Sequence, residues 1–198
     1  GYMTEEQLDT LENHVLVLGH GDLTEPILEE IAAKSEVLVV VPDEGRARRL
    51  SERGYTALTD DPSDEEAQRR GRIEAARAVI TATSNDAEDA LAILTARQLN
   101  PELTIVAAAT RRENVKKLKR AGADTVISPA VLGARFLAES ALGGGAGVAE
   151  QELLESDVSE ATADAVDPGD GAADAVGGGG DTPTTPGERR SGAGDSFE

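Results

Sequence analysis

Residues 14–24 read His-Val-Leu-Val-Leu-Gly-His-Gly-Asp-Leu-Thr, and this stretch decides the fold of the chain. Its four consecutive apolar residues predict a buried strand, and a helical pattern begins at about Thr24. A glycine-rich turn between a strand and a helix matches the first two glycines of the dinucleotide-binding fingerprint. Gly19 would permit the tight turn, and Gly21 would let the backbone approach a pyrophosphate. A glycine turn with no bound nucleotide is the alternative.

The loop after this strand is the first candidate ligand site. The free N–H groups and positive end of the following helix would hold phosphates beside His20, Asp22 and Leu23. Thr24 stands where the fingerprint has its third glycine, and its hydroxyl group either caps the helix or touches a phosphate. An aspartate at position 21 would place charge among the phosphates, so we expect Gly21→Asp to lose ligand binding and to keep its fold.

Apolar runs and helical patterns alternate through the body of the chain. The predicted strands are His14–Leu18, Glu36–Val41, Thr56–Leu58, Ala78–Ala82, Leu103–Ala108 and Thr125–Ile127. The predicted helices lie near 24–34, 45–53, 63–70, 86–99, 112–121 and 129–142. Strands that are apolar on nearly every residue are covered on both faces, which is typical of a parallel sheet. The sequence therefore predicts an α/β fold with a Rossmann-like, doubly wound, parallel six-stranded sheet.

Further candidate positions follow two strands at the edge of the sheet where a nucleotide crevice opens. Asp43 follows the second strand beyond Pro42, so it either binds a ribose or caps the helix that starts at about Gly45. Thr83 and Ser84 follow the fourth strand. Small polar residues at that place suit the edge of a ligand, and they suit a helix cap equally well.

Charge and composition exclude several classes of protein. The chain has 38 acidic and 19 basic residues, a formal net charge of −19, and only four lysines. This balance is typical of proteins from salt-loving organisms. It argues against nucleic acid as a partner, because a phosphate backbone attracts a basic face. With no cysteine, the chain has no disulfide bond or thiolate metal site. No apolar stretch approaches the roughly 20 residues of a membrane span.

The composition changes near Gly143. Glycine runs, prolines and scattered acids fill residues 143–198, with thirteen acidic and two basic residues. Such a segment buries too little apolar surface to offset the entropy of ordering, so we expect a disordered acidic tail. Residues 13–142 would form the ordered domain. Residues 1–12 would form a charged helical connector, with a helix start at Thr4.

Several motifs of the predicted domain resemble a known family. They are Gly19–Gly21, Gly54-Tyr55, Asp60-Asp61-Pro62-Ser63, the stretch 76–83 (Ala-Arg-Ala-Val-Ile-Thr-Ala-Thr), Glu113-Asn114-Val115 and the stretch 121–129 (Ala-Gly-Ala-Asp-Thr-Val-Ile-Ser-Pro). Together they resemble the N-terminal RCK domain, also called TrkA-N, which regulates potassium conductance. The resemblance covers residues 13–142, and the last two motifs are its most specific part.

This resemblance implies a non-catalytic cytoplasmic module at the inner face of the cell membrane. The module would regulate potassium transport beneath a channel pore or the membrane subunit of a transporter, as a homodimer or a larger ring. Binding of NAD(H) or an adenine nucleotide would change the shape of that ring. The connector would lead from pore helices, so the chain is expected to be the cytoplasmic piece of a longer membrane protein.

The resemblance also bears on metal ions and on subunit contacts. Calcium-gated relatives use three carboxylates, of which Asp61 supplies the first, whereas Ala108 and Thr110 occupy the other two places. No metal site of that kind is expected, and Asp61 remains a candidate for the ligand crevice. The helix at 129–142 resembles a crossover helix that packs on a neighbouring subunit, and a plain core helix is the alternative. Its candidate contacts are Val131, Leu132, Phe136, Leu137 and Leu142.

Two other functions compete with ligand sensing. An NAD-dependent oxidoreductase shares this fold, but it needs a general acid or base and a second domain for its substrate. The only histidines are His14, at the start of a strand, and His20, in the glycine turn. The other competitor is a scaffold ring that binds no ligand. Val41 stands where many relatives carry a ribose-binding acid, which counts against NAD among the candidate ligands.

Overall fold

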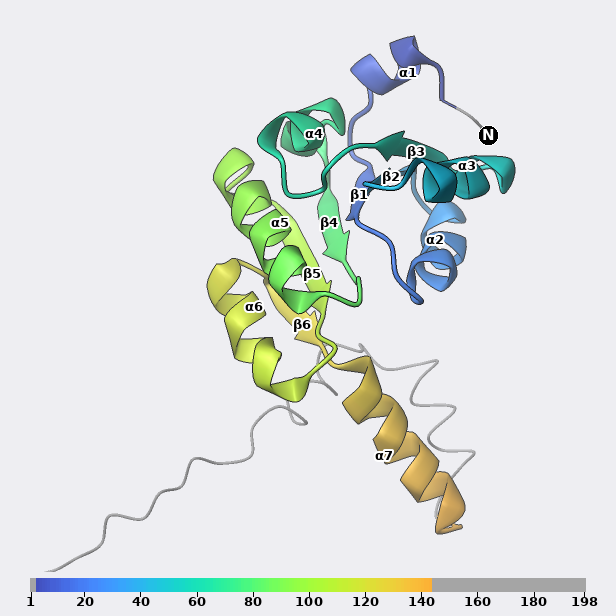
Figure 1. Cartoon of the computed structure of the whole chain (residues 1–198), viewed down its shortest axis with the longest axis vertical. Helices are drawn as coiled ribbons and strands as arrows, with labels where there is room; N and C mark the ends of the chain where they lie inside the picture. The colour runs from blue at the N-terminus through green and yellow to red at the C-terminus, as the bar shows by residue number, and fades with distance from the viewer. Residues whose placement is uncertain (1–2, 144–198) are drawn as a thin grey trace, which may run out of the picture. The chain divides into compact units, whose positions relative to one another are not determined.

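The computed structural model describes residues 3–143 of the chain and folds them into an α/β domain (Figure 1). The strands are β1 (Val15–Leu18), β2 (Val37–Val41), β3 (Thr56–Thr59), β4 (Ala78–Thr81), β5 (Thr104–Ala108) and β6 (Thr125–Ile127). The α-helices are α1 (Glu5–Asp9), α2 (Thr24–Ala32), α3 (Glu44–Glu52), α4 (Glu65–Arg70), α5 (Asp86–Leu99), α6 (Val115–Ala121) and α7 (Pro129–Ala141). Apart from Gly143, the predicted acidic tail lies outside the described residues.

The six strands form one parallel sheet in the order β3-β2-β1-β4-β5-β6. Val15 of β1 pairs with Val37 of β2 on one side and with Ala78 of β4 on the other. The strand order therefore reverses between β1 and β4, and the crevice of such a sheet opens at the carboxyl ends of these two strands. The predicted Rossmann-like fold class is confirmed.

Two apolar clusters, one on each face of the sheet, explain why the strands are apolar throughout. Leu16 and Leu18 of β1 pack in a cluster with residues of α4, α5 and α6, among them Ile93 and Leu118. Val15 and Val17 pack with residues of α2 and α3, among them Leu28 and Leu50. Successive side chains of a strand point to opposite faces, so helices on both faces bury every position of β1.

Local hydrogen bonds set the ends of several elements. A helix begins after Thr4, as predicted, where Thr4 and Gln7 form a reciprocal capping box. The helix predicted near 112–121 is divided: Arg112–Asn114 form a 3-10 turn and α6 follows at Val115. The helix predicted near 63–70 begins only at Glu65. These shifts of one to three residues are of the kind that caps and turns produce at helix ends.

Helix α7 differs from the other long helices because none of its residues is buried. Leu137 is 74% exposed and Leu142, directly after the helix, is 85% exposed. Figure 1 shows α7 leading away from the sheet beyond β6. The alternative of a core helix is therefore wrong for the described chain. Within residues 3–143, no helix is both long and apolar enough to cross a bilayer.

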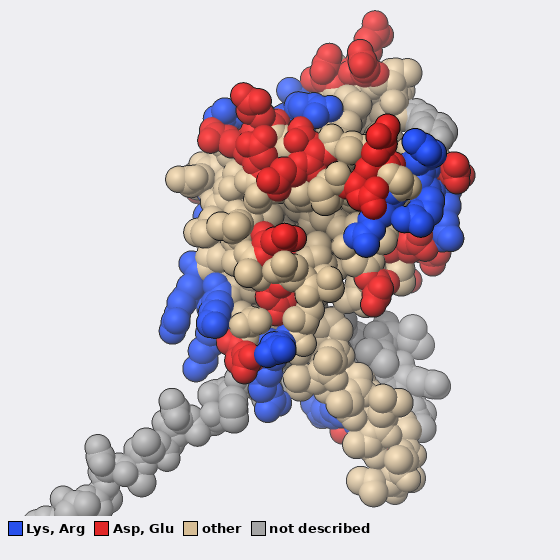
Figure 2. Space-filling model, in the orientation of Figure 1, with Lys and Arg blue, Asp and Glu red and all other residues tan. Residues whose placement is uncertain are grey.

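Charge is unevenly distributed over the described surface. Figure 2 shows acidic side chains gathered around α4 and basic ones over α6. The helix α6 carries Lys116, Lys117, Lys119 and Arg120, all exposed, and no acidic residue. Three of the four lysines of this acidic chain thus lie on one short helix.

Candidate functional site

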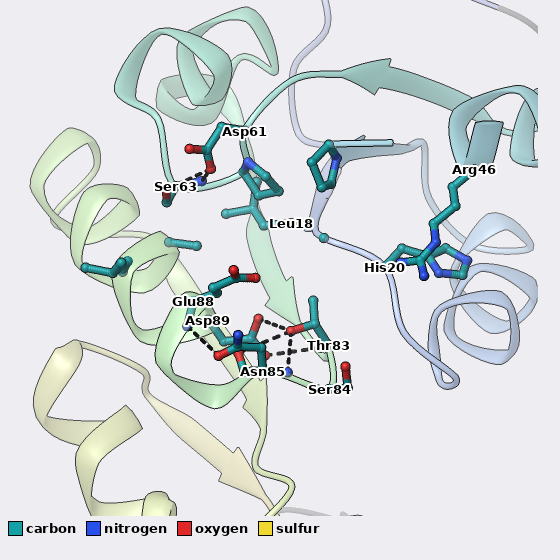
Figure 3. Close-up of a pocket in the computed structure, with 15 residues that line it drawn as sticks. Leu18, His20, Arg46, Asp61, Ser63, Thr83, Ser84, Asn85, Glu88 and Asp89 are labelled. Atoms are coloured by element: carbon teal, nitrogen blue, oxygen red, sulfur yellow. Dashed lines mark hydrogen bonds between the residues drawn. The ribbon is translucent and has the colours of Figure 1, made fainter. Parts of the chain in front are cut away.

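An open cavity of about 420 Å³ lies at the carboxyl ends of β1 and β4, where the strand order reverses (Figure 3). Its walls come from the end of β1, the loops after β2 and β3, the β4–α5 loop and the first turns of α5. A neighbouring cavity of about 250 Å³ is lined by the loop before α2, the loops after β4 and β5, and the start of α7. The loop after β4 borders both cavities.

The predicted site residues divide between these cavities. The larger cavity is lined by Gly19, His20, Asp61, Thr83 and Ser84. Asp22 and Leu23 line the smaller one, together with Thr83 and Ser84. Gly21, Thr24 and Asp43 line neither cavity. The structure thus brings most of the candidates from β1, β3 and β4 to one edge of the sheet, as parallel strands require.

The two glycines of the β1–α2 loop are needed because the β4–α5 loop passes close to them. Gly19 has φ +92°, and a Cβ atom there would lie 2.4 Å from the Thr83 methyl group. A Cβ on Gly21 would lie 2.7 Å from the carbonyl oxygen of Ala82 and 3.0 Å from the Thr83 Cα. Side chains at either position would collide with neighbouring atoms.

This packing corrects one expectation. Gly21→Asp cannot leave folding intact, because its Cβ atom would press on backbone atoms of the β4–α5 loop. Backbone yields less readily than the end of a flexible side chain, so overpacking of this kind destabilises the fold. Loss of ligand binding in that variant would therefore say little about the ligand itself.

Thr24 closes the loop internally. Its Oγ1 accepts a hydrogen bond from the Gly21 N–H at 2.8 Å, and its side chain is 1% exposed. The predicted capping role is wrong, because helix α2 has Leu23 as its N-cap and no side-chain cap hydrogen bond; the Thr24 hydroxyl instead closes the turn that begins at Gly21. In contrast, the N–H groups of His20, Asp22 and Leu23 donate no hydrogen bond within the described residues. Unpaired N–H groups at a helix start suit the oxygen atoms of a phosphate.

The two carboxylates that sequence analysis singled out are occupied by local turns. Asp43 caps α3, accepting from the Gly45 N–H at 2.7 Å. Asp61 accepts from the Ser63 N–H at 2.9 Å and from the Ser63 hydroxyl at 2.8 Å, while it still borders the larger cavity. No group of three histidine, aspartate or glutamate side chains in residues 3–143 is placed to hold a metal ion.

A basic side chain of α3 joins the site. Arg46 lines the larger cavity beside His20, and its nearest acid is Asp43 at 3.9 Å. Burial lowers the pKa of His20, and the positive charge of Arg46 lowers it further, so both favour the neutral imidazole. Arg46 was not among the selected site residues, because arginines on an exposed helix face usually bind no phosphate, although its place in the first turn after β2 favoured such a role.

The most buried charge of the site is Asp89, which sequence analysis also missed. Its carboxylate accepts from the Thr83 hydroxyl at 2.6 Å and from the Thr83 N–H at 3.1 Å (Figure 3). Burial is the main reason why the pKa of Asp89 rises to about 6. Asp89 stands on the helix stripe that Ala92, Ile93 and Ala96 bury, and an acid on an apolar stripe was the available signal.

Asp86 holds the neighbouring loop in place. Its carboxylate accepts from the Thr110 N–H, from the Thr110 hydroxyl at 2.9 Å and from the Asn114 side chain at 2.8 Å. These bonds fix the segment after β5 against α5. They give Asn114 of the Glu-Asn-Val motif a structural role.

Comparison with known proteins agrees with this geometry. The family model described as the TrkA-N domain matches residues 15–129. A probable potassium channel protein of Methanocaldococcus jannaschii is 29% identical over 139 residues, which are 68% of this chain and 40% of that protein. This chain spans between 22% and 42% of the length of the first three curated relatives.

Solved structures carry the same fold. The TrkA-N domain of the inner membrane protein YbaL from Escherichia coli superposes with a TM-score of 0.61 at 27% identity, over 65% of this chain and 96% of that one. The GsuK channel bound to NAD has a TM-score of 0.57 at 26% identity, over 63% of this chain and 22% of that chain. GsuK was also solved bound to ADP, with a TM-score of 0.56 at 25% identity, over 63% and 32%. Because the TrkA-N model matches more than half of the residues, this chain belongs to the TrkA-N domain family, the N-terminal part of RCK domains.

Proposed function

We propose that this domain is a non-catalytic sensor that regulates potassium transport by binding a nucleotide. The observation that carries the proposal is the loop after β1. There the N–H groups of His20, Asp22 and Leu23 lack partners, and they border cavities at the point where the strand order reverses. Ligands of doubly wound sheets bind at this point. A related channel has been solved with NAD and with ADP, which supports the same ligand class for this chain.

The candidate ligands are NAD(H) and adenine nucleotides. The β1–α2 loop would bind the phosphates through its N–H groups, and Arg46 would neutralise part of their charge. Asp61, Thr83 and Ser84 border the same space and offer polar atoms to a ribose or a base. The lack of an acid at Val41 favours an adenine nucleotide over NAD.

Regulation requires a second copy of the chain and a membrane partner. We infer that α7 packs on a neighbouring copy, since its leucines are exposed in the single chain. The dimer or ring would act at the inner face of the membrane, on a channel pore or transporter subunit. A ligand shifts such an assembly only if it binds one shape more tightly than another.

A scaffold without a ligand is the competing function, and one observation favours it. Close packing against the β4–α5 loop already accounts for both glycines, with no need for a phosphate. The glycine motif alone therefore does not decide between a sensor and a scaffold.

Calorimetric titration separates the two functions. NAD, NADH, AMP, ADP and ATP are added to the full chain at low and at high KCl, with thermal melting in parallel. A sensor releases or absorbs heat with at least one nucleotide and melts at a higher temperature in its presence. If none of the five nucleotides produces heat on titration or changes the melting temperature, the domain is a scaffold.

Arg46 provides the matched mutation. Arg46→Gln removes a positive charge from an exposed side chain of the cavity wall and should weaken nucleotide binding about tenfold. Arg48→Gln removes the same charge from the same helix outside the cavity, and it should leave the affinity unchanged. Equal affinities in the two variants would contradict the assigned site.

A further inference from the structure

Asp89 lies in the wall of the larger cavity, in the first turns of α5. Its side chain is buried with 2% exposure. One carboxylate oxygen accepts from the Thr83 hydroxyl at 2.6 Å, and the other accepts from the Thr83 N–H at 3.1 Å. The carboxylate thus engages both donors of one residue of the β4–α5 loop, as the dashed lines of Figure 3 show.

Thr83 also packs against the β1–α2 loop, called the glycine loop because it contains Gly19 and Gly21. Its methyl group fills the space beside Gly19, and its Cα lies only 3.0 Å from the position that a Cβ atom on Gly21 would take. Gly19 and Gly21 flank the unpaired N–H group of His20. A displacement of Thr83 must therefore displace the loop that would carry the phosphates, since packed atoms this close have no free space between them.

The two protonation states of Asp89 require different hydrogen bonds at Thr83. The ionised carboxylate only accepts, so the Thr83 hydroxyl must donate to it. When a proton is added, the carboxyl O–H donates to the Thr83 Oγ1, and the Thr83 hydroxyl turns to the carbonyl oxygen of Asn85, 3.3 Å away. The exchange leaves every donor with an acceptor, but it replaces the charge-assisted bond between Thr83 and Asp89 with a weaker neutral one, so Asp89 holds Thr83 less tightly.

We propose that Asp89 is a positioning residue of the nucleotide site, which sets the position of the glycine loop through Thr83 and makes nucleotide affinity depend on pH. This proposal rests on the proposed function, because it assigns the regulation of that same site. Asp89 acts through Thr83, because only 2% of Asp89 is exposed.

The direction of the effect follows from charge. Burial raises the pKa of Asp89 to about 6, and the negative charges of Asp86 and Glu88 on the same helix act in the same direction. Bound phosphate would favour the protonated form further. By linkage, protonation then favours binding, so affinity increases as the pH falls through 6. Across the cavity stand Asp61, Arg46 and His20. Burial and the charge of Arg46 lower the pKa of His20, and a test must exclude the titration of this imidazole.

The closing experiment measures the dissociation constant of NAD and ADP between about pH 5 and pH 7.5. It uses the full chain in a His20→Gln background, which removes the competing titration. Binding should be at least about fivefold tighter at the lower pH. Asp89→Asn mimics the protonated acid, so it should bind with the low-pH affinity at every pH. Glu88→Gln removes a charge from the same turn without touching Thr83, so it should keep the pH dependence, with a midpoint moved to lower pH because Glu88 raises the pKa of Asp89.

A ligand-free readout distinguishes this proposal from the proposed function. The amide NMR signals of Gly19, Gly21 and Thr83 should titrate together near pH 6 in the unliganded His20→Gln chain, and they should not do so once Asp89 is Asn. If the signals titrate but no nucleotide binds, Asp89 still controls the glycine loop, and the proposed nucleotide sensor is refuted. Absence of the titration, or a dissociation constant that does not change with pH, would overturn the role of Asp89.

Discussion

Gly21 has no space for a side chain, so even a substitution by alanine is expected to lower the stability of the fold. In Gly21→Ala the methyl group would lie 2.7 Å from the Ala82 carbonyl oxygen. We expect a loss of about 1–3 kcal/mol of unfolding free energy, measured by urea denaturation. Gly133→Ala is the control, since a Cβ there meets nothing within 4 Å and alanine favours the helix α7. Equal stability of the two variants would show that the loops are farther apart than described.

Asp89 predicts a pH dependence of stability whose sign can be worked out. Its pKa rises from 3.8 to about 6 on folding, so the folded state holds its proton more tightly. The resulting stabilisation is complete below pH 3.8 and is lost as the pH rises through about 6. Asp89→Asn should therefore stabilise the chain at pH 7.5, by up to about 3 kcal/mol.

The measurement is urea denaturation of both chains at several pH values. The advantage of Asp89→Asn should shrink as the pH falls below 6 and vanish near pH 4. A variant that is less stable than the parent chain at pH 7.5 would mean that the ionised carboxylate is well solvated.

Single-residue roles were predictable only where the local sequence limits the alternatives. Sequence analysis left two roles open for Asp43, and geometry selected the helix cap. It did not foresee the observed role of Thr24, whose hydroxyl accepts from the Gly21 N–H within the loop. Arg46 and Asp89 were missed because their part in the site depends on the phase of α3 and α5 against the sheet. Helix phase is set by packing between elements distant in the sequence, which a motif does not contain.

At the scale of elements, α7 predicts self-association. Leu137→Asp should lower the average mass in sedimentation equilibrium by weakening contact between copies, because a charge there opposes burial of the helix. The fold should persist, since Leu137 is 74% exposed in the single chain. Glu139→Gln on the same helix is the control and should associate like the parent chain. A parent chain that is monomeric at all concentrations would contradict this assignment of α7.

The strands were the most predictable elements. Most of their residues are apolar, and strands alternate with helices along the chain, so the parallel sheet followed from pattern alone. Helix starts were less predictable, because hydrogen bonds of single side chains determine them. Residues 112–121, for example, keep one helical pattern, yet the bonds of Asp86 to Thr110 and Asn114 accompany a 3-10 turn before α6.

For the whole molecule, the net charge of −19 predicts a strong dependence on salt. Repulsion among the acids opposes the compact state, and dissolved ions screen it. The midpoint temperature of thermal unfolding should rise as KCl increases from about 0.05 M to about 1 M, where the Debye length falls to roughly 3 Å. Most of the rise should come at the low end, because the Debye length shortens most steeply at low ionic strength. A midpoint that does not change with salt would mean that the acids are neutralised within the fold.

The tight fit of the glycine loop against the segment after β4 has an evolutionary consequence. Selection for a well-formed core preserves Gly19 and Gly21 even in a lineage that has stopped sensing any metabolite. Genome surveys that infer nucleotide binding from these two glycines would then count domains that bind no nucleotide as sensors. Arg46 is exposed and has no comparable structural role, so it can be substituted once ligand binding is lost. Its retention among orthologues is the better marker of a working receptor.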